Sequence, residues 1–261
     1  MPDLRSFSLE GKVVLQFGGS GLLGRALVAA LAEAGATLVV ASRNPAVLTG
    51  DAEAATRAGQ RVYLETVDLL DEPSIQALVG RVTQKHGALH GMVYNAVTRT
   101  MSGVSDPLVK WEESMRVNAT GFFAAVRACG DAMVRENRGS IVNISSQMGT
   151  IGPNYFLYEG TSMTVAPDYF FHKGGMTNLT RYLAAHYGRN KVRVNVVSPG
   201  GIYNPAKPQA PEFLERYGKM TMLGRMAEAR EIGGAVVFLL SDASTYITGA
   251  NLPIDGGYTA K

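Results

Sequence analysis

Three pairs in the sequence place a lysine four residues after a tyrosine: Tyr169–Lys173, Tyr187–Lys191 and Tyr203–Lys207. On a helix, side chains four residues apart share one face and lie about 5–6 Å from each other. A phenol with a pKa near 10 exchanges protons readily near pH 7 if its anion is stabilised by about 4 kcal/mol. An ammonium about 4 Å away, at an effective dielectric constant of about 20, supplies roughly that much. Such a pair can therefore act as an acid–base group.

Only one of the three pairs stands at the start of a predicted helix that follows the end of a strand. Tyr203–Lys207 contains Pro205, which a regular helix does not tolerate in its interior. Tyr187–Lys191 crosses "GRN", a helix-stop signal ahead of a strand. We therefore predict Tyr169–Lys173 as the reactive pair, although the spacing alone also fits an ordinary surface tyrosine and lysine.

Hydroxyl and amide side chains accompany this pair. Ser145 and Ser146 end the predicted strand "SIVNISS", where a hydroxyl can donate a hydrogen bond to a carbonyl or alcohol oxygen as hydride moves to or from its carbon. Asn118 opens a long predicted helix at "VNATG". It can hold a water or a backbone carbonyl that relays protons to the lysine, or cap the helix N-terminus, or do both.

The elements that must position these residues alternate between strand and helix. Nearly continuous apolar strands that alternate with helices are typical of a parallel sheet covered on both faces. We predict a single doubly wound α/β Rossmann domain over residues 1–261, with a central parallel sheet of about seven strands. Ligands bind such a sheet at the carboxyl ends of its strands. Predicted strands are 12–17, 37–42, 61–67, 89–95, 140–145, 191–198 and 251–254, and predicted helices are 22–35, 45–59, 71–87, 118–137, 169–188 and 227–241.

A glycine-rich turn joins the first strand to the first helix in "QFGGSGLLGRAL". Gly18, Gly21 and Gly24 supply positive φ, close approach of the backbone to a pyrophosphate, and close helix–strand packing. In this position the triplet predicts a dinucleotide site. The predicted cofactor-binding residues of the first four strand ends are Gly18, Ser20, Gly21, Leu22, Leu23, Ser42, Arg43, Asp68, Leu69, Asn95 and Ala96.

The end of the second strand, "VVASRN", indicates which dinucleotide binds. An NAD site usually places a carboxylate there for the ribose diol, but this chain has Ser42 and Arg43, with no acid before Asp51. An arginine can hold a 2′-phosphate in charge-assisted hydrogen bonds. We therefore favour NADP(H), with NAD(H) as the alternative. Asp68 either contacts the adenine or caps the helix that starts near Asp71.

Composition excludes several other classes of protein. Hydrophobic residues make up 46% of the 261 residues, enough for a sizeable core, and the net charge of +3 comes from scattered basic residues. We expect a soluble cytoplasmic protein with a small-molecule substrate and no nucleic-acid or membrane partner. The single cysteine, Cys129, lies in an apolar helix, where a buried thiol is the favoured interpretation. No metal site is predicted.

Taken together, the motifs "FGGSGLLG", "YNA", "VNATG", "IVNISS", "YFFHK", "VNVVSPGG" and "YITGANLPIDGGY" resemble those of the short-chain dehydrogenase/reductase family over essentially the whole chain. The resemblance implies a tetrad with Tyr169 as acid–base group and Ser146, not Ser145, as its serine. It also implies a homotetramer or homodimer built on the two long helices. Phe17 and Val97 depart from the family pattern. The implied tetrad is Asn118, Ser146, Tyr169 and Lys173, and the implied nicotinamide residues are Tyr169, Lys173, Pro199, Gly200, Ile202 and Asn204.

The interval between Ser146 and Tyr169 is nearly twice that of compact family members. We predict substrate loops at about 147–168 and 201–224, the second being Pro- and Gly-rich and mobile. The first overhangs the substrate or packs against a neighbouring subunit, and it is similar to members linked to nonulosonic-acid sugar biosynthesis. The predicted substrate residues are Ser146, Tyr155, Tyr158, Glu159, Tyr169 and Gly201.

These features predict an NADP(H)-dependent oxidoreductase that interconverts a carbonyl and an alcohol by hydride transfer, on a sugar or sugar-derived substrate. The alternative is a nucleotide-sugar epimerase or dehydratase with recycled nicotinamide, which the spacing of the three glycines favours and the short C-terminal portion opposes.

Overall fold

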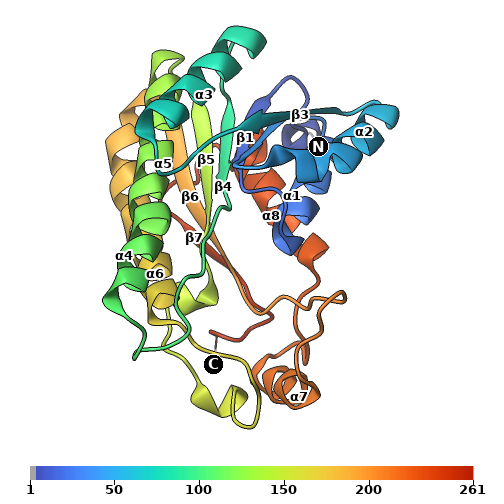
Figure 1. Ribbon diagram of the computed structural model, residues 1–261. Helices are drawn as coiled ribbons and strands as arrows, with labels where there is room; N and C mark the ends of the chain where they lie inside the picture. Colours follow the sequence, from blue (N-terminus) through green and yellow to red (C-terminus); the bar gives the residue numbers. More distant parts are fainter. Residues whose placement is uncertain (1–3, 261) are drawn as a thin grey trace.

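Seven strands form one parallel sheet between two layers of helices (Figure 1). The structure is a computed structural model and describes residues 4–260; the ends of the predicted domain, 1–3 and 261, lie outside the described residues. The strand order is β3-β2-β1-β4-β5-β6-β7, so the chain starts in the middle of the sheet and winds outward in both directions. The predicted single doubly wound Rossmann domain is confirmed. The strands are β1 Val13–Phe17, β2 Thr37–Ser42, β3 Arg61–Thr66, β4 Gly91–Tyr94, β5 Gly139–Ile144, β6 Val192–Pro199 and β7 Asn251–Ile254.

Helices α3 to α6 lie on one side of the sheet and α1, α2 and α8 on the other, while α7 lies beyond the carboxyl ends of the strands (Figure 1). A π-helical turn, η3, joins α4 to α5. Short 3-10 turns complete the connections. The helices are α1 Leu22–Glu33, α2 Thr49–Arg57, α3 Glu72–His86, α4 Leu108–Met115, η3 Arg116–Gly121, α5 Phe122–Arg135, α6 Pro167–Tyr187, α7 Pro211–Met220 and α8 Gly233–Leu240.

Two helices lie where the sequence predicted none. Helix α4 fills part of the segment interpreted as a loop after the fourth strand, and α7 occupies residues 211–220 of the predicted mobile loop. Helix α7 begins at Pro211, because the fixed φ of proline suits the first turn of a helix. The backbone N–H that proline lacks would have no partner within the helix at this position. Counting prolines as loop formers therefore gave the wrong prediction for this segment.

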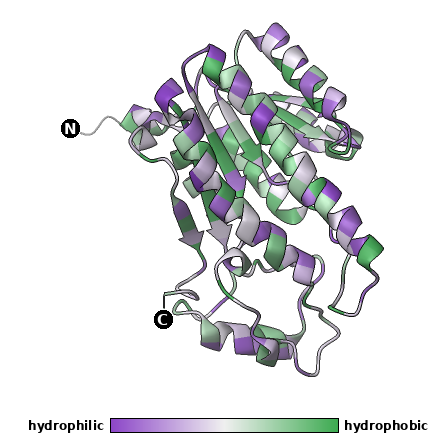
Figure 2. Ribbon diagram, turned by 90° about the vertical axis from the view of Figure 1, so that its left-hand side faces the viewer, coloured by the Kyte–Doolittle hydropathy of each residue, from purple (hydrophilic) through white to green (hydrophobic). Residues whose placement is uncertain are grey.

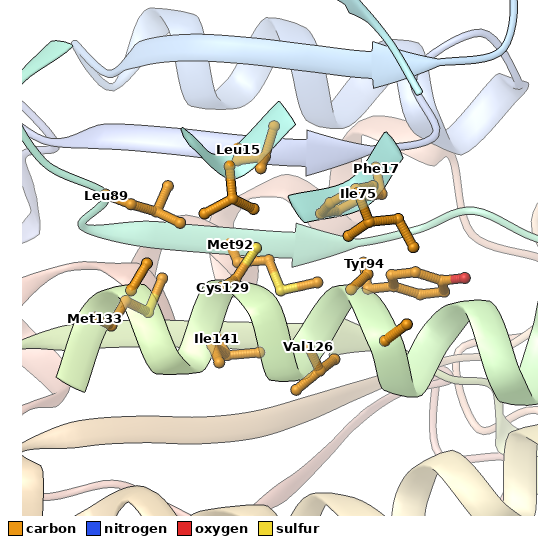
Figure 3. Packing of buried hydrophobic residues seen from close by; sticks show 14 of the residues in the cluster. Leu15, Phe17, Ile75, Leu89, Met92, Tyr94, Val126, Cys129, Met133 and Ile141 are labelled. Carbon is orange, nitrogen blue, oxygen red and sulfur yellow. The ribbon is translucent and has the colours of Figure 1, made fainter. Parts of the chain in front are cut away.

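The core lies on both faces of the sheet. Figure 3 shows the face covered by α3 and α5, where Leu15, Met92 and Ile141 of three adjacent strands pack against Cys129 and Met133 of α5. The thiol of Cys129 is fully buried, and burial raises its pKa, so it is a packing group, as expected. On the opposite face, the strands pack against α1 and α8.

Phe17, which departs from the family pattern, belongs to the core on the face covered by α3 and α5. Its ring lies 5.9 Å from that of Tyr94 between centroids, and the ring of Tyr94 lies 4.9 Å from that of Phe122. Packing between aromatic rings thus fixes the end of β1 beside the glycine turn.

Figure 2 shows hydrophobic and hydrophilic segments interspersed along the outer helices, with strongly hydrophobic strands behind them. Several large apolar side chains on these helices are exposed, among them Phe123 of α5 and Phe171 and Tyr182 of α6, at 40%, 59% and 66%. Within residues 4–260, no helix is both long enough and apolar enough to cross a lipid bilayer.

Candidate active site

Helix α6 positions the tyrosine and the lysine of the predicted reactive pair on one face. It begins at Pro167, so Tyr169 stands in its first turn and Lys173 one turn later. The hydroxyl of Tyr169 makes no hydrogen bond within residues 4–260 and borders a cavity. The Nζ atom of Lys173 lies 5.7 Å from the centroid of the tyrosine ring and donates a hydrogen bond of 2.6 Å to the carbonyl of Ile144.

The charge of Lys173 differs from what the sequence argument assumed. Its side chain is 3% exposed, and burial, helped by the nearby guanidinium of Arg99, lowers the pKa of Lys173 to about 7. The lysine therefore divides between ammonium and amine near neutral pH. Burial thus lowers the fraction of the charged ammonium on which the sequence argument relied.

The other two tyrosine–lysine pairs are not built for this chemistry. Tyr187 ends α6 and its hydroxyl donates to Asp131 of the neighbouring helix, while Lys191 follows in a left-handed turn at φ 56°. Tyr203 and Lys207 lie outside regular helix.

The two serines at the end of β5 have different surroundings. The hydroxyl of Ser145 is buried and bonds to the carbonyl of Lys173 at 3.0 Å and to the hydroxyl of Thr177 at 2.9 Å, so it fixes α6 to the sheet. The Oγ atom of Ser146 accepts a 3.2 Å hydrogen bond from the amide of Met148 and borders the cavity. Its O–H is left to donate to a ligand, which favours Ser146 as the reactive serine.

Asn118 lies inside the π-helical turn η3 and is not a helix N-cap, so that interpretation of the residue was wrong. Its side chain bonds both backbone groups of Thr98, accepting from the amide and donating to the carbonyl at 2.9 Å each. It also donates to Ser114, whose hydroxyl bonds to the buried carboxylate of Asp168, the residue before Tyr169. The extra residue of the π turn gives Asn118 this inward position. Asn118 thus connects the loop after β4 to the start of α6.

His172 packs its edge against the ring of Tyr169 at a centroid distance of 5.3 Å. It is buried, neither ring nitrogen has a hydrogen-bond partner within residues 4–260, and burial, with lesser contributions from Lys173 and Arg99, lowers its pKa to about 3. The imidazole is therefore neutral near pH 7 and supports the tyrosine ring without exchanging protons. Sequence reasoning missed it because a histidine between the two partners has no spacing signal of its own.

A cavity of about 530 Å³ opens beside the carboxyl ends of the strands and collects most of these residues. Among the residues that line it, Arg99, Gln147, Asp168, Gln209 and Tyr217 were not predicted. The last two lie on or next to α7, a helix that the sequence did not reveal. The predicted residues that line the cavity are Gly21, Leu22, Leu23, Asn95, Ser146, Tyr158, Tyr169, Lys173, Pro199, Gly200, Gly201, Ile202 and Asn204; those outside its lining are Gly18, Ser20, Ser42, Arg43, Asp68, Leu69, Ala96, Asn118, Tyr155 and Glu159.

The glycine turn fits a dinucleotide pyrophosphate. Gly18 has φ +83°, and a Cβ added there would lie 2.7 Å from the backbone of Ala96. A Cβ on Gly24 would lie 2.8 Å from the carbonyl of Gly19, so both glycines are needed for packing. A Cβ on Gly21 would meet no atom within 4 Å and would project into open space at the N-terminus of α1, where no side chain caps the free amides. Free amides at a helix N-terminus are the usual partners of a phosphate.

The end of β2 has polar groups that suit a ribose phosphate. The hydroxyl of Ser42 is buried without a hydrogen-bond partner, and Arg43 is exposed beside it. Asp51 bonds to Arg25, so its carboxylate is already engaged. Of the two roles considered for Asp68, the helix cap is wrong: Asp71 caps α3, while Asp68 accepts a 2.9 Å hydrogen bond from the amide of Leu70.

The insert between Ser146 and Tyr169 packs against α7 of the same chain. Leu157 is buried with Phe213, Tyr217 and Met226, and Arg216 donates hydrogen bonds to the carbonyls of residues 156 and 159. The hydroxyl of Tyr217 bonds to the amide of Gly201 and to Gln147, so it connects the insert to the loop after β6. Of the insert residues predicted to contact substrate, Tyr158 borders the cavity, whereas Tyr155 is 63% exposed and lies outside it.

Among residues 4–260, no group of three or more histidine, cysteine or carboxylate side chains could hold a metal ion.

Comparison with known proteins gives a consistent result. A family model described as enoyl-(acyl carrier protein) reductase matches residues 20–259. The chain is 34% identical to a 2,5-dichloro-2,5-cyclohexadiene-1,4-diol dehydrogenase of Sphingobium indicum, over 97% of this chain and 98% of the relative. It is also 34% identical to the NADP-dependent mannitol dehydrogenase of Hypocrea jecorina, over 98% of this chain and 95% of the relative.

A solved structure with the same fold is that of a gluconate 5-dehydrogenase from Burkholderia cenocepacia, in complex with NADP and tartrate. It superposes with a TM-score of 0.89 at 27% identity, over 99% of each chain. The matches cover nearly the whole chain. They agree with the parallel sheet, with the glycine turn, and with a cavity lined by Ser146, Tyr169 and Lys173. This protein therefore belongs to the short-chain dehydrogenase/reductase family of oxidoreductase enzymes.

Proposed function

We propose that this enzyme is an NADP(H)-dependent oxidoreductase that interconverts a carbonyl and an alcohol on a sugar or sugar-derived substrate. The observation that carries the proposal is the arrangement at the cavity: a tyrosine hydroxyl without a protein partner, a serine hydroxyl free to donate, and a buried lysine one helical turn from the tyrosine.

The side chains of Ser146 and Tyr169 act on the substrate oxygen. Ser146 donates a hydrogen bond to it and holds it beside the phenol. In the reducing direction Tyr169 gives its proton to that oxygen, and in the oxidising direction it takes the proton back. Lys173 stabilises the phenolate while charged, and because its pKa is about 7 it can also pass on a proton near neutral pH. A bound nicotinamide would supply or accept the hydride.

Several groups would hold this cofactor. The free amides at the start of α1 suit its pyrophosphate, and Asn95, Ile202 and Asn204, which border the cavity near Lys173, suit its nicotinamide half. The preference for the 2′-phosphate rests on Ser42 and Arg43, supported by the engagement of Asp51 with Arg25. The NADP-dependent mannitol dehydrogenase and the NADP complex of the gluconate dehydrogenase support the same choice.

The substrate class rests on the cavity and on the named relatives. Aromatic Tyr158 and Phe213 lie beside polar Gln147 and Gln209, a lining suited to a ring or chain that carries hydroxyl groups. The relatives, by their names, act on a cyclic diol, on mannitol and on gluconate. No specific contact favours an epimerase or dehydratase.

We further propose a cytoplasmic homotetramer or homodimer, assembled through α5 and α6. The exposed rings of Phe123, Phe171 and Tyr182 on these helices support a protein partner there. Sedimentation of the wild type and of a Phe171→Glu, Tyr182→Glu double variant tests this: the variant should sediment as a smaller species, and an unchanged distribution would exclude this interface.

The enzymatic proposal is tested by steady-state hydride transfer with NADPH and a panel of keto sugars, monitored by nicotinamide absorbance. Tyr169→Phe removes only the hydroxyl and should lower turnover at least about 100-fold. Tyr203→Phe, at one of the alternative pairs, is the matched control and should keep wild-type turnover. If Tyr169→Phe turns over at the wild-type rate, the proposed mechanism is wrong.

A further inference from the structure

Arg99 is the exposed charged side chain of the cavity. Three charged residues in the described part of the chain line it: Arg99, Asp168 and Lys173. Asp168 and Lys173 are buried and engaged, the first with the hydroxyl of Ser114 and the second with the carbonyl of Ile144. Arg99 is exposed and forms neither an ion pair nor a hydrogen bond within residues 4–260. An arginine that lines a cavity without an acidic partner is open to an anionic ligand.

The guanidinium of Arg99 lies beside the proposed acid–base group. It stands over the ring of Tyr169, with 5.0 Å between the guanidinium carbon and the ring centroid. This contact restrains the guanidinium beside the ring, and its N–H groups, which have no partner within residues 4–260, can bind a ligand. A molecule held by Arg99 would therefore place a neighbouring carbon within reach of the tyrosine hydroxyl.

The backbone that carries Arg99 is held on both sides. The side chain of Asn118 bonds both the amide and the carbonyl of Thr98, and the hydroxyl of Thr100 donates a 2.6 Å hydrogen bond to the carbonyl of Lys110. The arginine thus starts from a fixed position, which reduces the entropy lost on ligand binding. This also gives Asn118 a positioning role for the substrate side of the cavity.

We propose that Arg99 binds a carboxylate of the substrate, and that the substrate is an oxo acid or hydroxy acid. The inference rests on the oxidoreductase function proposed above, because the carboxylate must belong to the molecule that meets Tyr169. One planar guanidinium matches one carboxylate through two parallel N–H···O bonds. A phosphate dianion is matched best by more than one cation, and the other cation of the lining, Lys173, is buried and bonded to the carbonyl of Ile144. Met101, Tyr158 and Met163 line the same cavity and can contact the carbon skeleton of such a molecule.

Equilibrium binding tests the inference without relying on turnover. Wild-type protein saturated with NADPH is titrated by calorimetry with 4-hydroxycyclohexanecarboxylate and with the neutral, nearly isosteric 4-hydroxycyclohexanecarboxamide. The carboxylate should bind about 10- to 100-fold more tightly. Arg99→Gln should reduce this preference to less than about 3-fold by weakening the carboxylate alone. Arg189→Gln, an exposed arginine on the turn after α6, is the matched control and should keep the preference.

Four results would overturn the inference. Two of them concern the acid and the amide: equal binding of both by the wild type, and a carboxylate preference that survives in Arg99→Gln. The third is Arg99-dependent binding of inorganic phosphate that is tighter than binding of the acid. The fourth is a loss of NADPH affinity in Arg99→Gln as large as the loss of acid affinity. The last would assign the arginine to the cofactor.

Turnover separates this inference from the proposed function. The kcat/KM values for 4-oxocyclohexanecarboxylate and its amide should differ as the affinities do, mainly through KM. Turnover of neutral keto sugars without Arg99-dependent acid binding would refute the carboxylate site and keep the oxidoreductase. The opposite result is acid binding that is lost in Arg99→Gln, together with no hydride transfer by the wild type to any carbonyl of the panel. It would support the carboxylate site and refute the proposed reaction.

Discussion

Replacing Lys173 by methionine should change how the stability of the protein depends on pH. In the folded protein burial, helped by Arg99, lowers the pKa of Lys173 to about 7, whereas the model value for a solvated lysine is 10.5. Between these pH values the unfolded chain binds a proton that the folded chain has released. The free energy of unfolding of the wild type therefore rises with pH in this window. The stability gained in this way is lost again as the pH falls toward 7.

The size of the effect follows from the same shift. Each bound proton changes the free energy of unfolding by about 1.4 kcal/mol per pH unit. Because the folded lysine is still half protonated near pH 7, the wild type should gain about 2 kcal/mol relative to Lys173→Met between pH 7 and pH 9. Methionine does not titrate, so the difference between the two proteins isolates this group from the tyrosines and the termini.

Urea unfolding at a series of pH values, monitored by the fluorescence of the single tryptophan, measures this difference. The tryptophan, Trp111, packs 5.1 Å from the ring of Phe171 on α6 and reports on that helix. Lys207→Met removes an exposed lysine with the same spacing from a tyrosine and controls for the loss of one charge. A difference that stays constant from pH 7 to pH 9, or that falls, would show that the buried lysine keeps its proton and would contradict a lowered pKa of Lys173.

Three further predictions concern individual side chains. Arg43→Ala should weaken NADPH binding about 10- to 100-fold and leave NADH binding unchanged, as measured by calorimetry; an unchanged NADPH preference would exclude the arginine as a phosphate ligand. Ser146→Ala should lower kcat about 100-fold or more, whereas Ser145→Ala should cost about 1 kcal/mol of stability with kcat within a few-fold of wild type, and the reverse pattern in kinetics and urea unfolding would exchange their roles. His172→Leu should raise the free energy of unfolding by about 1–3 kcal/mol, because an unpartnered buried imidazole is removed. Since the pKa of His172 is lowered to about 3, the advantage of that variant should grow as the pH falls from 6.5, and a constant advantage in acid-titrated urea unfolding would contradict the buried neutral imidazole.

The sheet and the position of Tyr169 and Lys173 at the start of one helix could be predicted from the sequence because they depend on strong local signals. Buried parallel strands are almost continuously apolar, and the glycine turn has a fixed place after the first strand. The choice of Tyr169–Lys173 over two pairs of equal spacing needed only helix-stop rules and the position of Pro205. These signals act within a few residues, so no tertiary information was required.

The parts that sequence reasoning missed depend on contacts between distant segments. Asn118 looked like a helix cap because nothing local reveals a π turn or the bond to Thr98, 20 residues away. The sequence does not distinguish Arg99 from the other scattered arginines; only the fold shows that it lies over the ring of Tyr169. The charge of Lys173 is set by burial, which spacing does not give. Helix α7 was not predicted, because its prolines were interpreted as loop formers without regard to the position that each would occupy in a helix.

The insert between Ser146 and Tyr169 packs with α7 and forms a part of the molecule that is separate from the core around the sheet. Leu157, Phe213, Tyr217 and Tyr258 form a small hydrophobic cluster of their own, apart from the two large clusters that flank the strands. Phe213 and Tyr217 of this cluster line the cavity, so substitutions there can reshape one side of it while the glycine turn and the helix of Tyr169 and Lys173 stay in place. A family with one scaffold and many substrates gains variety at little cost in stability from such an arrangement.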